Sequence, residues 1–207
     1  MLKNGLILGG FALCCTGLVA LVNALTIDTI KAQQQKQLAK TLTEIIAEDL
    51  HDNVLSEACI LVHDEHLLGS KNPLPAYIAS KDGQAVALAI EAIAPDGYNG
   101  DIKLIIGVDN HNKLLGVRTL THQETPGLGD KIELRKSDWV MQFTGMIFNS
   151  TGPQWAVKKD GGEIDQFTGA TITPRAYIKA INNALLFVEN NRNQLYRSPI
   201  TCEANHE

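Results

Sequence analysis

The chain has 207 residues, of which 44% are hydrophobic and 20% are charged. This balance is typical of one packed domain and excludes a wholly disordered protein. Lys and Arg number 18 against 23 Asp and Glu, so the net charge is −5, and only 5% of the residues are aromatic. Because a broad basic surface and a stacking platform for single strands are both absent from this composition, no nucleic-acid partner is expected.

The first feature along the chain is an apolar run over residues 5–22 that contains no charged residue. A helix of about 20 such residues crosses the roughly 30 Å hydrocarbon core of a bilayer. A cleaved signal peptide is the alternative, but its apolar region is shorter and precedes a small-residue cleavage site, which residues 22–24 match poorly. We therefore predict a single-pass membrane anchor over residues 1–27. The lysines on its two sides do not by themselves decide its orientation.

Residues 30–50 place apolar side chains at spacings of three and four, with Lys and Glu between them. This periodicity predicts an amphipathic helix. We expect it to lie within a connecting segment, residues 28–55, between the anchor and the folded domain.

Four strand-like segments come next, the first short and apolar and the second and third alternating, separated by turn residues such as Asp82 and Gly83. They cover residues 76–81, 84–93, 101–109 and 114–122. Consecutive strands joined by tight turns predict an antiparallel meander.

Helical segments follow the strands. Short helices are expected over 130–136 and 138–144, the second capped by Ser137, and a longer helix after Thr173. The predicted fold class is therefore α+β, an antiparallel sheet packed with helices and preceded by one transmembrane helix. The folded domain is expected to span residues 56–190, and the polar residues 191–207 to form a loose tail.

One constrained loop follows the fourth strand, over residues 122–131. Pro126 fixes one backbone angle, whereas Gly127 and Gly129 permit conformations that other residues avoid. A sharp connection between strand and helix is one interpretation. A loop that wraps a ligand, with Glu124 and Thr125 as polar contacts, is the other.

A second glycine-bearing stretch, residues 158–175, leads into the last helix. Thr173 is a typical N-cap residue, and Pro174 suits the first helical position. The hydroxyl of Thr171 is then expected just ahead of a helix N-terminus. Unpaired N–H groups and a partial positive charge make such an end suitable for a phosphate.

The residues immediately before Thr171 strengthen this interpretation. Gly169 and Ala170 carry almost no side chain, so an anion can approach the backbone closely. Thr168 supplies a second hydroxyl on the other side of this gap. A capped helix start that binds no ligand remains the alternative.

The sequence Asp-Gln-Phe-Thr-Gly-Ala-Thr over 165–171 resembles the flavinylation motif of the FMN-binding domain family. Within that family the chain is similar to the G subunits of Rnf (also called Rsx) electron-transport complexes. Four stretches match in order, namely 94–100, 122–134, 137–139 and 158–175, the last of which contains the motif. Gln123 departs from the pattern, because a second histidine is expected at that position in close relatives.

The resemblance implies that FMN is joined through its phosphate to Thr171, by a separate flavin transferase that uses FAD. It makes Thr168, Gly169 and Ala170 candidates for holding the phosphate, and the loop residues Glu124, Thr125 and Leu128 candidates for contacting the flavin. Asp165 is expected to serve turn structure or transferase recognition. Trp155 and Phe167 are expected either beside the flavin ring or in the core.

The resemblance also implies a role and a location. The chain would be an electron carrier that is not active alone, within a complex that couples electron flow to ion movement across the bacterial inner membrane. Its partners would be the other subunits of that complex, with the folded domain in the periplasm. No catalytic residue and no metal site are predicted.

Two other functions stay open at this stage. The C subunit of a sodium-translocating NADH:quinone reductase shares the same flavin chemistry. An anchored periplasmic adapter without flavin would use the threonine motif only as a helix start.

The two cysteines outside the anchor, Cys59 and Cys202, allow one further hypothesis. In an oxidising periplasm they are expected to form a disulfide that ties the tail to the start of the domain. Two independent thiols are the alternative.

Overall fold

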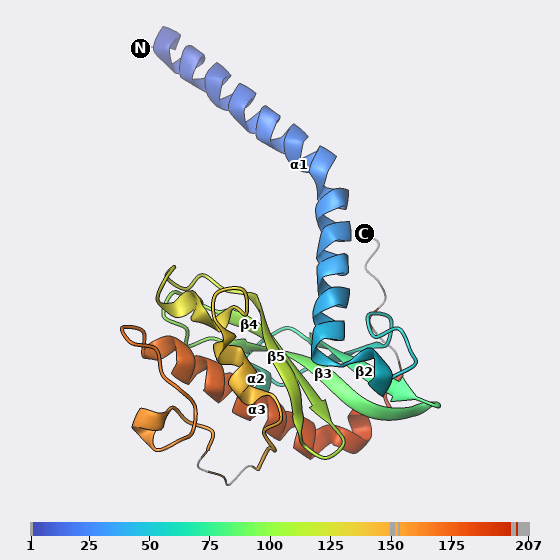
Figure 1. Cartoon of the computed structure of the whole chain (residues 1–207). Helices are drawn as coiled ribbons and strands as arrows, with labels where there is room; N and C mark the ends of the chain where they lie inside the picture. The colour runs from blue at the N-terminus through green and yellow to red at the C-terminus, as the bar shows by residue number, and fades with distance from the viewer. Residues whose placement is uncertain (1, 150–151, 153, 200–201, 203–207) are drawn as a thin grey trace. The chain divides into compact units, whose positions relative to one another are not determined.

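The computed structural model describes residues 2–149, 152, 154–199 and 202. The chain divides into two compact units, Met1–Lys40 and Thr41–Glu207. The first unit is the greater part of helix α1 (Leu2–Ile45), which by length and composition is able to cross a membrane (Figure 1). Its large apolar side chains, Phe11 and Leu13 among them, are exposed. The helix expected over 30–50 is continuous with the anchor and ends earlier, at Ile45, before a 3-10 turn η1 (Glu48–Leu50).

The second unit is built on a five-stranded antiparallel sheet in which every strand pairs with its neighbours in sequence. The strands are β1 (Cys59–Val62), β2 (Leu74–Lys81), β3 (Gln84–Ala94), β4 (Ile102–Asp109) and β5 (Leu114–Thr121). Four of them correspond to the predicted meander. Asp82 and Gly83 both have positive φ, as a two-residue hairpin turn between β2 and β3 requires. The fifth strand, β1, was not predicted because its four residues are too few to show an alternation.

Helix α3 (Ile172–Leu195) packs along one face of the sheet (Figure 1). Alternate residues of the strands, such as Leu88 and Ile106, meet its apolar stripe in a single buried core. The chain between the sheet and α3 adds the 3-10 helices η2 (Gly129–Ile132), η3 (Asp138–Phe143) and η4 (Lys158–Asp160). The short helix α2 (Glu65–Leu68) lies between β1 and β2. The helices expected at 130–136 and 138–144 are thus short 3-10 turns, and Ser137 caps the second of them by accepting from the backbone N–H of Trp139.

The opposite face of the sheet is covered where α1 ends. Ile45 lies against Gly107 of β4 and Gly116 of β5, and a Cβ on Gly107 would overlap the Cγ2 atom of Ile45. Glu44 accepts from the Arg118 guanidinium at 3.3 Å. The last turn of α1 therefore belongs to the folded domain, because two glycines allow it to lie close to the sheet.

The C-terminal segment is fastened to the first strand. Cys59 and Cys202 form a disulfide with their Cα atoms 5.2 Å apart, so the expected pairing is confirmed. The backbone N–H of Cys202 also donates to the Cys59 carbonyl at 3.2 Å. Residues 191–195, which were expected in the loose tail, belong to α3, and the buried side chain of Leu195 joins the core; positions 200, 201 and 203–207 of that predicted tail lie outside the described residues.

Residues 145–148 lie beside the start of β5 at the other side of the sheet. The N–H of Leu114 donates to the Met146 carbonyl at 2.9 Å, and the N–H of Gly145 donates to the Leu114 carbonyl at 2.8 Å. Lys113 forms a further antiparallel bridge with Ile147. The segment after η3 is thereby joined to the sheet by its backbone.

Glu91 of β3 is a buried carboxylate whose effect on stability depends on pH. It is 3% exposed, and its Oε2 atom lies 2.6 Å from the Lys103 ammonium. Burial raises the pKa of Glu91 despite the opposing effect of Lys103. A carboxyl whose folded-state pKa is raised stabilises the fold fully below its unfolded pKa of about 4.3, and this contribution is lost as pH rises through the folded pKa.

We therefore expect Glu91→Gln to gain stability relative to the wild type as the pH is raised from about 4 towards neutral. Urea denaturation of the detergent-solubilised chain at several pH values measures this. Glu133→Gln is the control with the opposite sign and a lower pH range: Arg135 and His122 lower the pKa of Glu133, so its contribution is present above the unfolded pKa of about 4.3 and is lost as the pH falls through the folded pKa. A pH-independent difference between Glu91→Gln and the wild type would contradict the prediction.

Candidate functional site

A cavity of about 300 Å³ opens between the loop that follows β5 and the start of α3. Six of the seven residues predicted for the site line it. The lining residues are Tyr98, Glu124, Thr125, Leu128, Gly129, Gly169, Ala170, Thr171, Ile172 and Thr173. Thr168, the seventh, is exposed and lies outside this lining. Two loops that are far apart in the sequence thus form one site.

The loop after β5 is folded tightly upon itself. The N–H groups of Leu128 and Gly129 both donate to the Thr125 carbonyl at 3.1 Å. The N–H of Gly127 donates to the buried carboxylate of Asp130 at 2.8 Å. A Cβ on Gly129 would lie 2.6 Å from the Glu124 carboxylate, so glycine is required there for close packing.

Glu124 connects three segments at the wall of the cavity. Its side chain is buried, with Oε2 accepting from the Thr173 hydroxyl at 2.5 Å and Oε1 accepting from the Asn99 N–H at 3.2 Å. The neighbouring Gln123 is exposed and accepts from the Asn99 side chain through its carbonyl, at 2.6 Å. Since this contact uses the backbone, it does not depend on which side chain occupies position 123.

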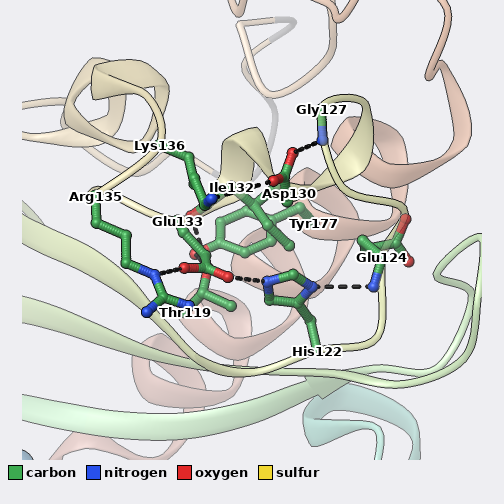
Figure 2. A network of polar contacts seen from close by, with 10 residues as sticks. All are labelled: Thr119, His122, Glu124, Gly127, Asp130, Ile132, Glu133, Arg135, Lys136 and Tyr177. Atoms are coloured by element: carbon green, nitrogen blue, oxygen red, sulfur yellow. Dashed lines mark hydrogen bonds and ion pairs between the residues drawn. The ribbon is translucent and has the colours of Figure 1, made fainter.

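Behind the cavity wall, a histidine joins the two ends of the loop (Figure 2). His122 Nδ1 receives the backbone N–H of Glu124 at 3.0 Å, and His122 Nε2 lies 2.6 Å from Glu133 Oε1. The other carboxylate oxygen of Glu133 accepts from Arg135. The Arg135 bond, followed by the His122 bond, lowers the pKa of Glu133, so this carboxylate is ionised at neutral pH.

The base of the loop is further held by hydroxyl groups (Figure 2). Thr119 Oγ1 donates to the Ile132 carbonyl at 2.8 Å and lies 3.0 Å from the Tyr177 hydroxyl. Because the Thr119 hydroxyl donates its proton to the Ile132 carbonyl, the Tyr177 hydroxyl is the donor in the second bond. Burial raises the pKa of Tyr177, which keeps the phenol protonated as this bond requires.

The segment before α3 is held by the aromatic core and by ion pairs. Trp139 Nε1 donates to the Asp165 carbonyl at 2.7 Å, and the Trp139 ring lies 4.8 Å from that of Phe167. The Asp165 carboxylate pairs with Lys158 at 2.6 Å. Asp165 therefore contacts two residues of the surrounding fold, and its expected role in turn structure or in transferase recognition stays a prediction.

Trp155 and Phe167, considered as neighbours of the flavin ring, are both buried in the core. Neither lines the cavity. Each contacts another aromatic ring instead, Phe148 in one case and Trp139 in the other. Of the two positions considered for Trp155 and Phe167, the structure shows the one in the core.

Thr171 occupies the N-cap position of α3, and its side chain makes no cap hydrogen bond. The expected cap, Thr173, instead lies inside the first turn, where it is buried and donates to Glu124. The Thr-Pro pattern predicted the cap two residues late because the carboxylate partner comes from a distant loop. Gly169, with φ of +83°, turns the chain immediately before the helix.

The first turn of α3 therefore begins beside the cavity with N–H groups that the helix itself does not pair. Gly169 and Ala170 keep the approach to this backbone free of bulky side chains. An exposed threonine hydroxyl lies at the same end. These features suit a phosphate group that is attached to, or bound at, Thr171.

Four lining residues were not predicted for the site, namely Tyr98, Gly129, Ile172 and Thr173. The side chain of Tyr98 is 67% exposed, and that of Ile172 47%, so both present apolar surface beside the cavity. Tyr98 lies within the matching stretch 94–100, which was the available signal for it. The contact of Thr173 with Glu124 left no local signal.

Comparison with known proteins agrees with this site. A family model described as the FMN-binding domain matches residues 97–186, and one described as the RnfG N-terminal region matches residues 1–45. Proteins named as the G subunit of an ion-translocating oxidoreductase complex are similar over the full length. Those of Shewanella baltica and Shewanella oneidensis are 58% and 56% identical over 100% of this chain and 98% of their own length. The Vibrio cholerae protein is 54% identical over 97% of this chain and 96% of its own. The chain therefore belongs to the family of G subunits of ion-translocating oxidoreductase complexes and contains their FMN-binding domain.

Proposed function

We propose that this chain is an electron carrier of a membrane-bound complex and that it holds FMN through a phosphoester bond to Thr171. The observation that carries the proposal is the position of Thr171, an exposed residue that occupies the N-cap of α3 and lines a cavity of about 300 Å³. FMN, when bound, supplies one-electron and two-electron redox chemistry. The protein supplies attachment, position and electrostatics.

The residues around the cavity fit the two ends of such a group. The backbone at Gly169 and Ala170 and the first turn of α3 favour the phosphate, and Thr168 adds a hydroxyl close by in sequence. Glu124, Thr125 and Leu128 form the opposing wall and are proposed to contact the ring system. In this arrangement the exposed Leu128 supplies apolar surface.

Attachment requires a flavin transferase with FAD as its substrate. The Thr171 oxygen forms a bond to the phosphorus that carries the riboflavin part. The pyrophosphate bond of FAD breaks, AMP leaves, and the hydroxyl proton passes to solvent. Because the ester is formed at the phosphate, the flavin ring keeps its redox chemistry unchanged.

Two features of the chain support the proposed location. An anchor over residues 1–27 is proposed to cross the bacterial inner membrane once and, through the segment 28–55, to place the FMN-binding domain in the periplasm. The Cys59–Cys202 disulfide supports this side of the membrane, since disulfides persist in oxidising compartments. The other subunits of the ion-translocating complex are the proposed partners, and ion movement belongs to the complex as a whole.

Intact mass of the full chain tests the attachment. The chain is purified in detergent from a host that contains the flavin transferase, and from the same host without it. We expect a mass increase of one FMN less one water in the first sample only, with the added group on the peptide that contains Thr171. An unmodified chain from the first host, beside a flavinylated control protein, would favour an adapter without flavin.

A further inference from the structure

The loop that forms one wall of the cavity is closed across its base by side chains rather than by the sheet. The last sheet residue before it is Thr121, and the loop returns at Glu133. The His122 and Glu133 side chains meet at 2.6 Å, eleven positions apart. All cavity-lining residues of this loop, from Glu124 to Gly129, lie between these two (Figure 2).

The hydrogen-bond pattern fixes the protonation of His122. The backbone N–H of Glu124 can only donate, so the Nδ1 atom that receives it, at 3.0 Å, carries no proton. The Nε2 atom then holds the single proton and donates it to the Glu133 carboxylate. Arg135 bonds the second oxygen of that carboxylate and helps to keep Glu133 ionised and in place.

From this geometry we propose that His122, neutral and protonated on Nε2, is a positioning residue for the flavin site. It closes the loop 123–132 and holds the Glu124 backbone where the carboxylate of Glu124 can meet Thr173 and Asn99. The role of the loop in contacting flavin rests on the proposed function above. The closure of the loop by His122 does not.

Three contacts show why the position of Glu124 depends on this bond. Its carboxylate is confined between Gly97 and Gly129, whose added Cβ atoms would lie 2.9 Å and 2.6 Å from its two oxygens. Both oxygens are also engaged, by the Thr173 hydroxyl at 2.5 Å and the Asn99 N–H at 3.2 Å, so a displacement of the Glu124 backbone by about 1 Å would take at least one of these bonds out of hydrogen-bond range. His122, which is itself partly buried, restrains that backbone directly.

Two substitutions separate the two hydrogen bonds of the His122 imidazole, which accepts from the Glu124 N–H and donates to Glu133. Asparagine has an acceptor oxygen near the position of Nδ1, so His122→Asn keeps the bond to the Glu124 N–H and loses the donor to Glu133. Glutamine reaches the position of Nε2, so His122→Gln keeps that donor and loses the Nδ1 acceptor. Both are compared with His122→Ala and the wild type, as full chains in detergent.

The first measurement needs no flavin. Amide hydrogen exchange at Glu124, followed by NMR, is expected to be about fivefold faster in His122→Gln and His122→Ala, the factor for one ordinary hydrogen bond of about 1 kcal/mol. In His122→Asn it is expected to stay within about twofold of the wild type. In the wild type, the ring nitrogen signals of His122 are expected to show the Nε2–H tautomer. The Nδ1–H tautomer in the wild type would overturn the proposal even if a variant failed to fold, and equal exchange in four folded chains would overturn it as well.

The second measurement uses chains matured with the flavin transferase. All variants are expected to keep covalent flavin on a denaturing gel, because Thr171 lies on the other side of the cavity. The visible circular dichroism and the midpoint potential of the flavin are expected to change in His122→Gln and to be restored in His122→Asn. If the wild type itself carries no flavin, the proposed function fails while the exchange data still test His122. Flavin signals that are identical in all variants would overturn the positioning role.

Discussion

Thr171→Ala is expected to remove all covalent flavin from the chain. The alanine variant has no oxygen from which a phosphoester can form, and the exposed Thr168 lies outside the cavity lining and does not replace it. Flavin fluorescence of the protein band on a denaturing gel measures this directly, with the chains expressed beside the flavin transferase. A band at background for Thr171→Ala and a bright band for the wild type are expected.

Two matched variants make the result specific. Thr171→Ser keeps a hydroxyl at the same position and is expected to be fluorescent, whereas Thr168→Ala is expected to leave the fluorescence of the band intact. Thr171 makes no cap hydrogen bond, so its loss should change the free energy of unfolding by less than about 0.5 kcal/mol. Fluorescence that persists in Thr171→Ala would place the attachment at another residue.

Loss of the Cys59–Cys202 disulfide is expected to produce the largest change in stability. The bond joins residues 143 positions apart, so it restricts nearly the whole domain in the unfolded state. Removing a native disulfide costs about 2–4 kcal/mol in typical proteins, and long loops lie towards the upper end of that range. The double variant Cys59→Ser, Cys202→Ser is therefore expected to unfold at a clearly lower urea concentration.

The chain provides its own control for this experiment. Cys14 and Cys15 are exposed, unpaired cysteines of α1. Replacing both with serine is expected to leave the unfolding transition of the domain unchanged. Adding a reductant should move the wild type to the transition of the Cys59, Cys202 double variant and leave that variant unaffected. Equal stability of wild type and double variant would contradict a structural role for the bond.

The elements that were predicted correctly are those whose signals are local. Strands β2 to β5 are each at least eight residues long, and turn residues that can be recognised in the sequence separate them. Strand β1 is four residues long and exists because it pairs with β2, a contact that no local pattern reports. The extension of α3 past residue 190 likewise depends on the burial of Leu195 in the core.

The candidate site likewise has a part that could be predicted from local signals and a part that could not. Thr171 and its neighbours could be identified because the whole motif lies within seven consecutive residues and precedes a helix. The hydrogen bond between Glu124 and Thr173, which lie 49 positions apart, could not be predicted, because each residue alone has an ordinary local explanation. Only the folded chain shows that the predicted N-cap residue is a hydrogen-bond donor to the opposite wall.

The contacts along the two outer strands have a consequence for assembly. A strand at the border of a sheet offers free N–H and C=O groups to which another chain can add itself. In this domain the backbone N–H of Cys202 donates to a carbonyl of β1, and residues 145–147 bind the backbone at the start of β5. These contacts cover part of each border and limit the addition of a foreign strand there. Reduction of the disulfide would release one border, and reduced protein is then exposed to self-association through β1.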